Sequence, residues 1–144
     1  MELTRITAAL TLAAALLPAA AGARTAGART AGASPLEGVY RVAWTATELT
    51  AAGATRQYVH SSCPSRCLLT MTLRAGHARI HGGPPPDFRA TYAATGSAVS
   101  FVAPHYILVA RWSLTGRTLR LHVTKATDTG DGIIFGAKPW TKIG

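Results

Sequence analysis

The stretch that decides the fold is LTMTLRAGHARI, residues 69–80, in which apolar and polar side chains alternate on both sides of Ala75-Gly76. Alternation with a period of two is typical of a β-strand that buries one face. A small residue followed by glycine is typical of a tight hairpin loop. A two-residue loop at this point makes apolar residues face one another in two pairs, Leu73 with Ala78 and Met71 with Ile80. The stretch therefore predicts an antiparallel hairpin with one apolar face.

The same pattern occurs twice more downstream, around Thr95-Gly96 and around Thr115-Gly116. Loops at these dipeptides predict five further apolar pairs: Tyr92 with Val99, Ala90 with Phe101, Trp112 with Leu119, Ala110 with Leu121, and Leu108 with Val123. A slip of one residue would mix apolar and polar faces in each hairpin. The three hairpins predict a six-stranded antiparallel meander.

The flanking segments raise the expected number of strands to about eight. Residues 38–44 alternate like a first strand, and Thr45 with Glu48 matches the capping box that starts a helix, which Gly53 can end. Residues 133–135 and 140–143 predict a closing strand. Eight antiparallel strands close economically into a barrel. The expected fold class is all-β, a small up-and-down antiparallel β-barrel with one short N-terminal helix.

Several features resemble those of a known group of proteins. They are Gly38-x-Tyr40 with Trp44, the short helix, the meander, Trp112-Ser113-Leu114-x-Gly116, and the ending from Phe135 to Ile143. Together they resemble small exported bacterial lipocalin-like (calycin-type) β-barrel domains and the C-terminal segment of some bacterial extracellular solute-binding proteins. Lipocalins proper carry tryptophan where this chain has Tyr40. The resemblance implies a barrel and an extracellular location, and no established activity.

The first 35 residues predict export. Arg5 precedes an apolar run over residues 6–20, and Ala21-Gly22-Ala23 has the small residues that signal peptidase accepts. We expect residues 1–23 to be a signal peptide, 24–35 a flexible Ala/Gly/Arg/Thr linker, and 36–144 the lipocalin-like β-barrel domain. We therefore expect a secreted protein that has no transmembrane segment after cleavage. The alternative is an uncleaved N-terminal anchor.

Two cysteines, Cys63 and Cys67, lie within Cys-Pro-Ser-Arg-Cys. A nearby pair outside the cytoplasm is usually oxidised, so we expect a local disulfide. A redox site usually has Cys-x-x-Cys spacing, and a zinc site requires four ligands.

The formal net charge is +9. Such a charge suits an anionic partner such as a cell-envelope polymer, and it also keeps a small domain soluble. The hairpins predict that Arg74 faces His77, that Thr72 faces Arg79, and that Arg111 faces Arg120. Since like charges opposed on a sheet are unfavourable, Arg74, Arg79, Arg111 and Arg120 form a candidate anion-binding surface. The alternative is a solvated exterior without a ligand.

Five aromatic residues are expected on the inner face of the barrel: Tyr40, Trp44, Tyr92, Phe101 and Trp112. They are candidates to line a pocket for a small apolar or amphipathic molecule. Ordinary core packing explains them equally well.

No constellation in the sequence favours catalysis. Asp128-Thr129-Gly130 matches an aspartic-protease tripeptide, but there is one copy, so it predicts a turn. His77 and His81 on one strand would lie about 13 Å apart, too far to share one metal ion. The expectation is a monomeric, non-enzymatic binding protein with no cofactor, no metal and no specific nucleic-acid partner.

Overall fold

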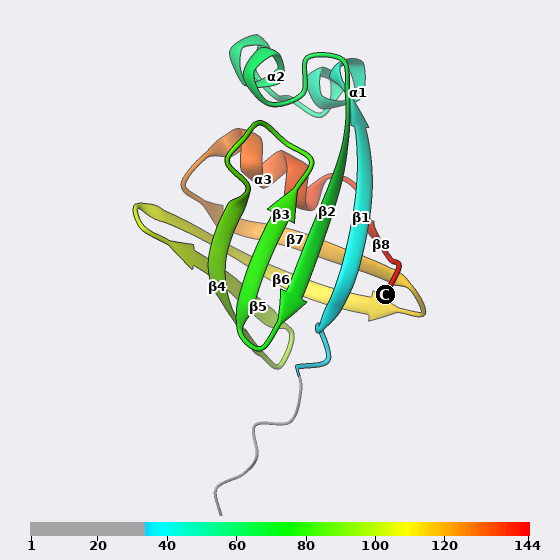
Figure 1. Ribbon diagram of the computed structural model, residues 1–144, viewed down its shortest axis with the longest axis vertical. Helices are drawn as coiled ribbons and strands as arrows, with labels where there is room; N and C mark the ends of the chain where they lie inside the picture. The colour runs from blue at the N-terminus through cyan, green and yellow to red at the C-terminus, as the bar shows by residue number, and fades with distance from the viewer. Residues whose placement is uncertain (1–33) are drawn as a thin grey trace, which may run out of the picture. The chain divides into compact units, whose positions relative to one another are not determined.

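The computed structural model describes residues 34–144, which form a closed antiparallel barrel of eight strands in sequential order (Figure 1). The predicted signal peptide and residues 24–33 of the predicted linker lie outside the described residues. The strands are β1 (Gly38–Thr45), β2 (Arg66–Arg74), β3 (His77–His81), β4 (Phe88–Thr95), β5 (Ala98–Ala103), β6 (Tyr106–Thr115), β7 (Thr118–Ala126) and β8 (Trp140–Lys142). The expected eight-stranded antiparallel barrel is therefore confirmed.

The short strand β8 closes the barrel. Tyr40 of β1 is paired with Lys142, and Leu119 of β7 is paired with Trp140, so β8 bridges the first and seventh strands. Closure leaves no sheet edge open to pairing with another chain. The prediction that residues 133–135 contribute to the closing strand is wrong, because they lie in a helix.

Within residues 34–144 three helices accompany the barrel, whereas the sequence predicted one: α1 (Ala46–Ala51), α2 (Arg56–Ser62) and α3 (Thr129–Gly136). A capping box starts α1, with the Thr45 hydroxyl accepting from the Glu48 amide and the Glu48 carboxylate accepting from the Thr45 amide. Thr55 caps α2. Asp128 was predicted to lie in a turn, but its carboxylate caps α3 by accepting from two backbone amides. Short capped helices carry little periodicity, which explains why two were missed.

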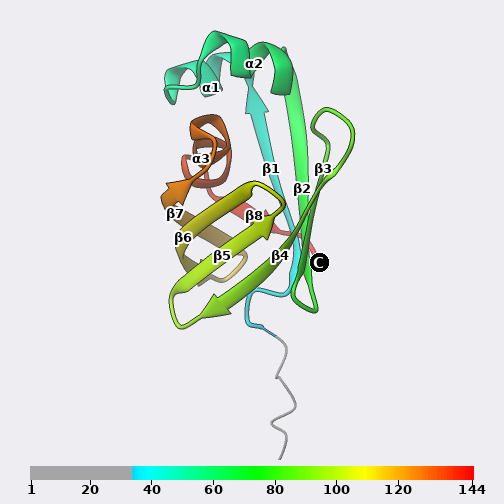
Figure 2. The same ribbon diagram turned by 90° about the vertical axis from the view of Figure 1, so that its left-hand side faces the viewer.

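The antiparallel order gathers the longer connections at one end of the barrel. Helices α1 and α2 join β1 to β2, and α3 joins β7 to β8. Figures 1 and 2 both show these helices at the same end, and the loop over residues 82–87 returns there as well. We call this the helical end. The two-residue turns at residues 75–76, 96–97 and 116–117 lie at the opposite end, the turn end, and a fourth tight turn, Pro104-His105 between β5 and β6, lies at the helical end.

The register of the first hairpin is confirmed, with Leu73 opposite Ala78. The second and third hairpins are each shifted by two residues from the prediction, so that Tyr92 faces Phe101 and Trp112 faces Leu121. Gly96 and Gly116 have φ values of 56° and 58° and occupy the first loop position. A glycine with positive φ at that position is typical of a type II′ turn, whereas the prediction placed it second.

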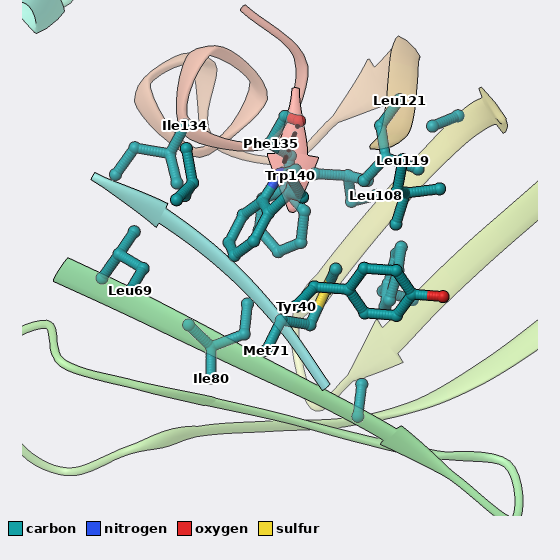
Figure 3. Close-up of a cluster of buried hydrophobic side chains, with 14 of the residues drawn as sticks. Tyr40, Leu69, Met71, Ile80, Leu108, Leu119, Leu121, Ile134, Phe135 and Trp140 are labelled. Carbon is teal, nitrogen blue, oxygen red and sulfur yellow. Dashed lines mark hydrogen bonds between the residues drawn. The ribbon is translucent and has the colours of Figure 1, made fainter. Parts of the chain in front are cut away.

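The interior of the barrel is filled by side chains. Phe135 of α3 lies between two aromatic rings, with centroids 5.5 Å from Phe101 and 5.9 Å from Trp140. Tyr92 continues the series at 6.3 Å from Phe101. Figure 3 shows Phe135 and Trp140 among aliphatic side chains of β2, β3, β6 and β7. Helix α3 therefore supplies part of the core that the strands alone leave unfilled.

Within residues 34–144, none of the three helices combines the length and apolar character of a membrane-crossing helix.

Candidate functional site

A cavity of about 180 Å³ opens at the helical end. It lies where α2, α3, the 82–87 loop and the first residues of β4 and β6 meet. Most of the lining is apolar, and the polar exceptions come from both helices and from β6. The lining residues are Tyr58, Ser62, Leu69, Ile80, Gly83, Pro84, Pro86, Phe88, Tyr106, Asp131, Ile134 and Phe135.

A hydrogen bond between α2 and α3 forms the polar side of this cavity. The Tyr58 hydroxyl donates to Asp131 Oδ1 over 2.5 Å. Gly130 makes this approach possible, because a Cβ atom there would overlap the Tyr58 ring. The buried Gly130 backbone thus packs directly against the aromatic face.

Tyr106 lies at the start of β6 and adds a second phenol. Its hydroxyl oxygen is buried and has no hydrogen-bond partner among the described residues. Its ring makes an edge-to-face contact with Phe88, with centroids 4.9 Å apart. A buried polar atom without a partner is costly, so this hydroxyl is well placed to contact a bound group.

The electrostatics of the cavity are governed by desolvation. Burial raises the pKa of Asp131, and the neighbouring Asp128 adds to this, while the hydrogen bond from Tyr58 opposes it. Burial and the Asp131 carboxylate likewise raise the pKa of the Tyr58 and Tyr106 phenols. Both phenols are therefore protonated and can donate at neutral pH.

Asp131, like Glu37 and Asp128, has no basic partner among the described residues. Asp87 forms an ion pair with Arg79 and a hydrogen bond with His81, and Glu48 forms an ion pair with Lys138. Within residues 34–144, Asp131 forms no ion pair, although the chain has 15 lysines and arginines. The half-buried carboxylate is held by a neutral hydroxyl instead.

A second, larger groove of about 470 Å³ lies between α2 and the start of α3. Tyr58 borders both this groove and the 180 Å³ cavity. The remaining lining comes from residues 53–61 and 127–133 and includes several hydroxyl groups. The groove extends the polar surface next to Asp131 without adding a cationic side chain.

The structure places the five predicted lining aromatics away from this cavity. Tyr40, Trp44, Tyr92 and Phe101 are buried in the packed core. Trp112 is half-buried and borders a groove on β6 and β7. Ligand binding by these five residues stays a prediction, and the observed contacts are those of core packing.

The four candidate anion-binding arginines are divided between two grooves. Arg74 and Arg79 line a groove of about 280 Å³ on β2–β4, and Arg111 and Arg120 line another of about 440 Å³ on β6 and β7. The predicted opposition of Arg111 and Arg120 is wrong, because Arg111 faces His122 and Arg120 faces Ser113. This correction follows from the shifted register of the third hairpin.

The groove on β2–β4 contains a basic pair that the sequence reasoning missed. Arg79 on β3 faces Arg89 on β4. Arg79 is also held by Asp87, which accepts from its Nε over 2.8 Å. Arg89 adds to the positive charge of the groove alongside Arg74 and His77.

The predicted disulfide between Cys63 and Cys67 is confirmed. Cys63 caps the C-terminal end of α2, and Cys67 lies on β2, opposite Trp44 of β1. The bond therefore fastens the helix that carries Tyr58 to the barrel wall. Because α2 carries Tyr58, this local disulfide helps to hold one wall of the cavity in position.

Tyr58 and Tyr106 were not identified from the sequence, and Asp131 was expected to lie in a turn rather than beside a cavity. Residues 54–66 have no clear periodicity, so α2 was not expected there. The signals that could have found the two helices are Thr55 and Asp128, both good N-cap residues. No local pattern brings Tyr106 to them, because that proximity depends on closure of the barrel.

The described residues contain no group of three or more histidine, cysteine or acidic side chains arranged to hold a metal ion. Comparison of the chain with protein-family models, with curated proteins and with solved structures gives no match.

Proposed function

We propose that this protein is an exported, non-enzymatic binding protein that holds a small amphipathic molecule in the helical-end cavity. The observation that carries the proposal is an apolar cavity with a carboxylate and two phenols on one side. Binding sites for small molecules typically combine an apolar lining with a few well-placed polar groups. The barrel supplies the rigid wall, and the two helices supply the polar groups.

The size of the cavity favours a compact ligand. An engineered apolar cavity of about 150 Å³ is sufficient to bind benzene. The cavity here has about 180 Å³. A single aromatic ring or a short branched alkyl group with one polar substituent therefore fits it.

Export and a lipocalin-like relationship are parts of the same proposal. The apolar run ending in Ala21-Gly22-Ala23 supports a cleaved signal peptide, and the disulfide supports an oxidising compartment. The eight-stranded up-and-down barrel supports the relationship to lipocalin-like domains. N-terminal sequencing of protein recovered from the culture medium is expected to begin at Arg24. Recovery of an intact N-terminus in the membrane fraction would contradict cleavage of the signal peptide and release of the domain.

Filling the cavity tests the binding site. Titration calorimetry with benzyl alcohol is expected to show saturable binding to the purified chain. Ile134→Phe places a larger side chain in the cavity and is expected to abolish that binding. Val102→Phe is the matched control, because Val102 is 46% exposed on β5 and does not line the cavity. Absence of binding to the wild-type protein, or undiminished binding to folded Ile134→Phe, would contradict the proposal.

A second function is favoured by the basic groove on β2–β4, where Arg79 faces Arg89 beside Arg74 and His77. An anionic cell-envelope polymer lying across this groove would relieve the repulsion between these side chains. Retention on immobilised heparin is expected to weaken with salt, and Arg89→Ala is expected to reduce the salt slope by about 1. Arg56→Ala on α2 is the control. Elution independent of salt would contradict this function.

A further inference from the structure

We infer that the polar group of the ligand is a protonated amine, which binds between Asp131, Tyr58 and Tyr106. This inference rests on the proposed function, because it names the class of molecule that occupies the helical-end cavity.

The first argument is the charge balance of the site. Asp131 is a half-buried carboxylate without an ion pair among residues 34–144. In that part of the chain, Asp87 and Glu48 each contact a basic side chain, whereas Glu37 and Asp128 form no ion pair; of these two, Asp128 is exposed and Glu37 accepts from the Ala75 amide. Burying a carboxylate without a counter-charge is unfavourable, and a cation restores the balance. An ammonium group is the simplest organic cation that fits a cavity of this size.

The second argument is hydrogen-bonding capacity. The Tyr58 hydroxyl already donates to Asp131 Oδ1, and the Tyr106 hydroxyl has no partner among the described residues. A protonated primary amine has three N–H donors. It can donate to the Asp131 carboxylate and to the Tyr106 oxygen at the same time. A neutral alcohol has one donor and leaves the carboxylate charge unpaired.

The third argument is the aromatic surroundings. Tyr58, Phe88 and Tyr106 all line the cavity, and the last two meet edge to face. Cations are attracted to the faces of aromatic rings, and more strongly where water is excluded. The apolar remainder of the ligand then contacts Leu69, Ile80 and Ile134. An anionic ligand would be repelled by Asp131 despite the overall charge of +9.

The test compares three ring compounds that differ in one group: benzylamine, benzyl alcohol and benzoate. Calorimetry at neutral pH is expected to rank the amine about tenfold tighter than the alcohol, the difference typical of a charge-assisted hydrogen bond. Benzoate is expected to bind most weakly. The comparison uses the wild-type chain, so it does not depend on the folding of any variant.

Two variants assign the preference to this site. Asp131→Asn keeps the size of the side chain and is expected to bring the amine-to-alcohol ratio to about one. Tyr106→Phe keeps the ring and is expected to weaken the amine alone. Glu37→Gln removes the same charge at the turn end and is expected to leave the ratio unchanged.

The outcomes separate the two proposals. Binding of the alcohol as tightly as the amine would overturn the amine inference and leave the binding site standing. An unchanged ratio in folded Asp131→Asn would also overturn it. Failure of all three compounds to bind would overturn the proposed function itself.

Discussion

The Tyr58 hydroxyl donates a hydrogen bond to the Asp131 carboxylate across 73 positions of sequence, and this contact joins α2 to α3 over the helical end of the barrel. The contact holds the Asp131 carboxylate in a partly desolvated environment. The stability of the fold should therefore depend on whether that carboxylate is charged.

Asp131 is expected to make the protein less stable as the pH rises through its titration. Burial raises its pKa in the folded state, with Tyr58, Tyr106 and Asp128 around it, so the folded protein keeps the proton to higher pH than the unfolded chain. Between the unfolded pKa, about 3.9, and the raised folded pKa, the free energy of unfolding falls with rising pH. Asp131→Asn removes this dependence.

Urea denaturation over a pH series measures the effect as the wild-type stability minus that of Asp131→Asn. This difference should be constant below the unfolded pKa and then decline as the pH rises through the interval. Asp87 and Glu48, whose pKa values are lowered by their partners, act in the opposite direction and cancel in the difference. A stability difference that increases with pH would contradict a raised pKa of Asp131 in the folded state.

Gly130→Ala is expected to displace Tyr58. The added methyl group would overlap the Tyr58 ring, so either α2 or the start of α3 must move and the hydrogen bond to Asp131 is lost. Overpacking of this kind typically costs about 1–3 kcal/mol. Gly132→Ala is the matched control, because its methyl group would meet the Ala126 and Val123 side chains at ordinary contact distances of 3.4 and 3.8 Å. Equal unfolding free energies for the two variants in urea would contradict the close packing at Gly130.

Phe135→Ala is expected to cost about 3–5 kcal/mol of unfolding free energy. The ring lies between Phe101 and Trp140, and its removal leaves a hole in the barrel interior that neighbouring side chains cannot close. Val102→Ala, at an exposed position on β5, should change stability by less than about 0.5 kcal/mol. Chemical denaturation of both variants decides whether α3 is part of the core. A loss no larger for Phe135→Ala than for Val102→Ala would show that it is not.

Removal of the disulfide is expected to act mainly on α2. Cys63→Ala with Cys67→Ala opens a loop with a sequence separation of four, whose closure contributes about 2 kcal/mol. Amide exchange should accelerate most in Arg56–Ser62, because Cys63 fastens the end of that helix to β2. Amides of β6 and β7 serve as the internal reference. Uniform acceleration throughout the barrel would contradict a local role.

The assignment of strand faces was predictable from sequence, and the pairing of the strands was only partly so. The alternating pattern correctly placed Leu121 and Phe101 inside the barrel. A shift of two residues keeps every side chain on the same face, so the pattern could not exclude it. The position of Gly96 within its loop decided the register, and that depends on turn geometry.

Of the candidate site, only the disulfide was predictable from the sequence, because it joins residues that are close along the chain. The disulfide follows from two cysteines four positions apart. The cavity, in contrast, combines Tyr58, Tyr106 and Asp131 from three elements that are distant in sequence. The division of the candidate arginines into two grooves also depends on where β2–β4 and β6–β7 lie around the barrel.

By itself, the sequence determined the number of barrel strands, the buried face of the hairpins and the cysteine pair, because each depends on residues that are close along the chain. Only the tertiary structure decided that Phe135 of α3 fills the barrel interior and that Asp131 meets Tyr58 beside a cavity. These contacts depend on the closure of β8 against β1 and on the packing of two short helices, and no periodic pattern in the sequence records either.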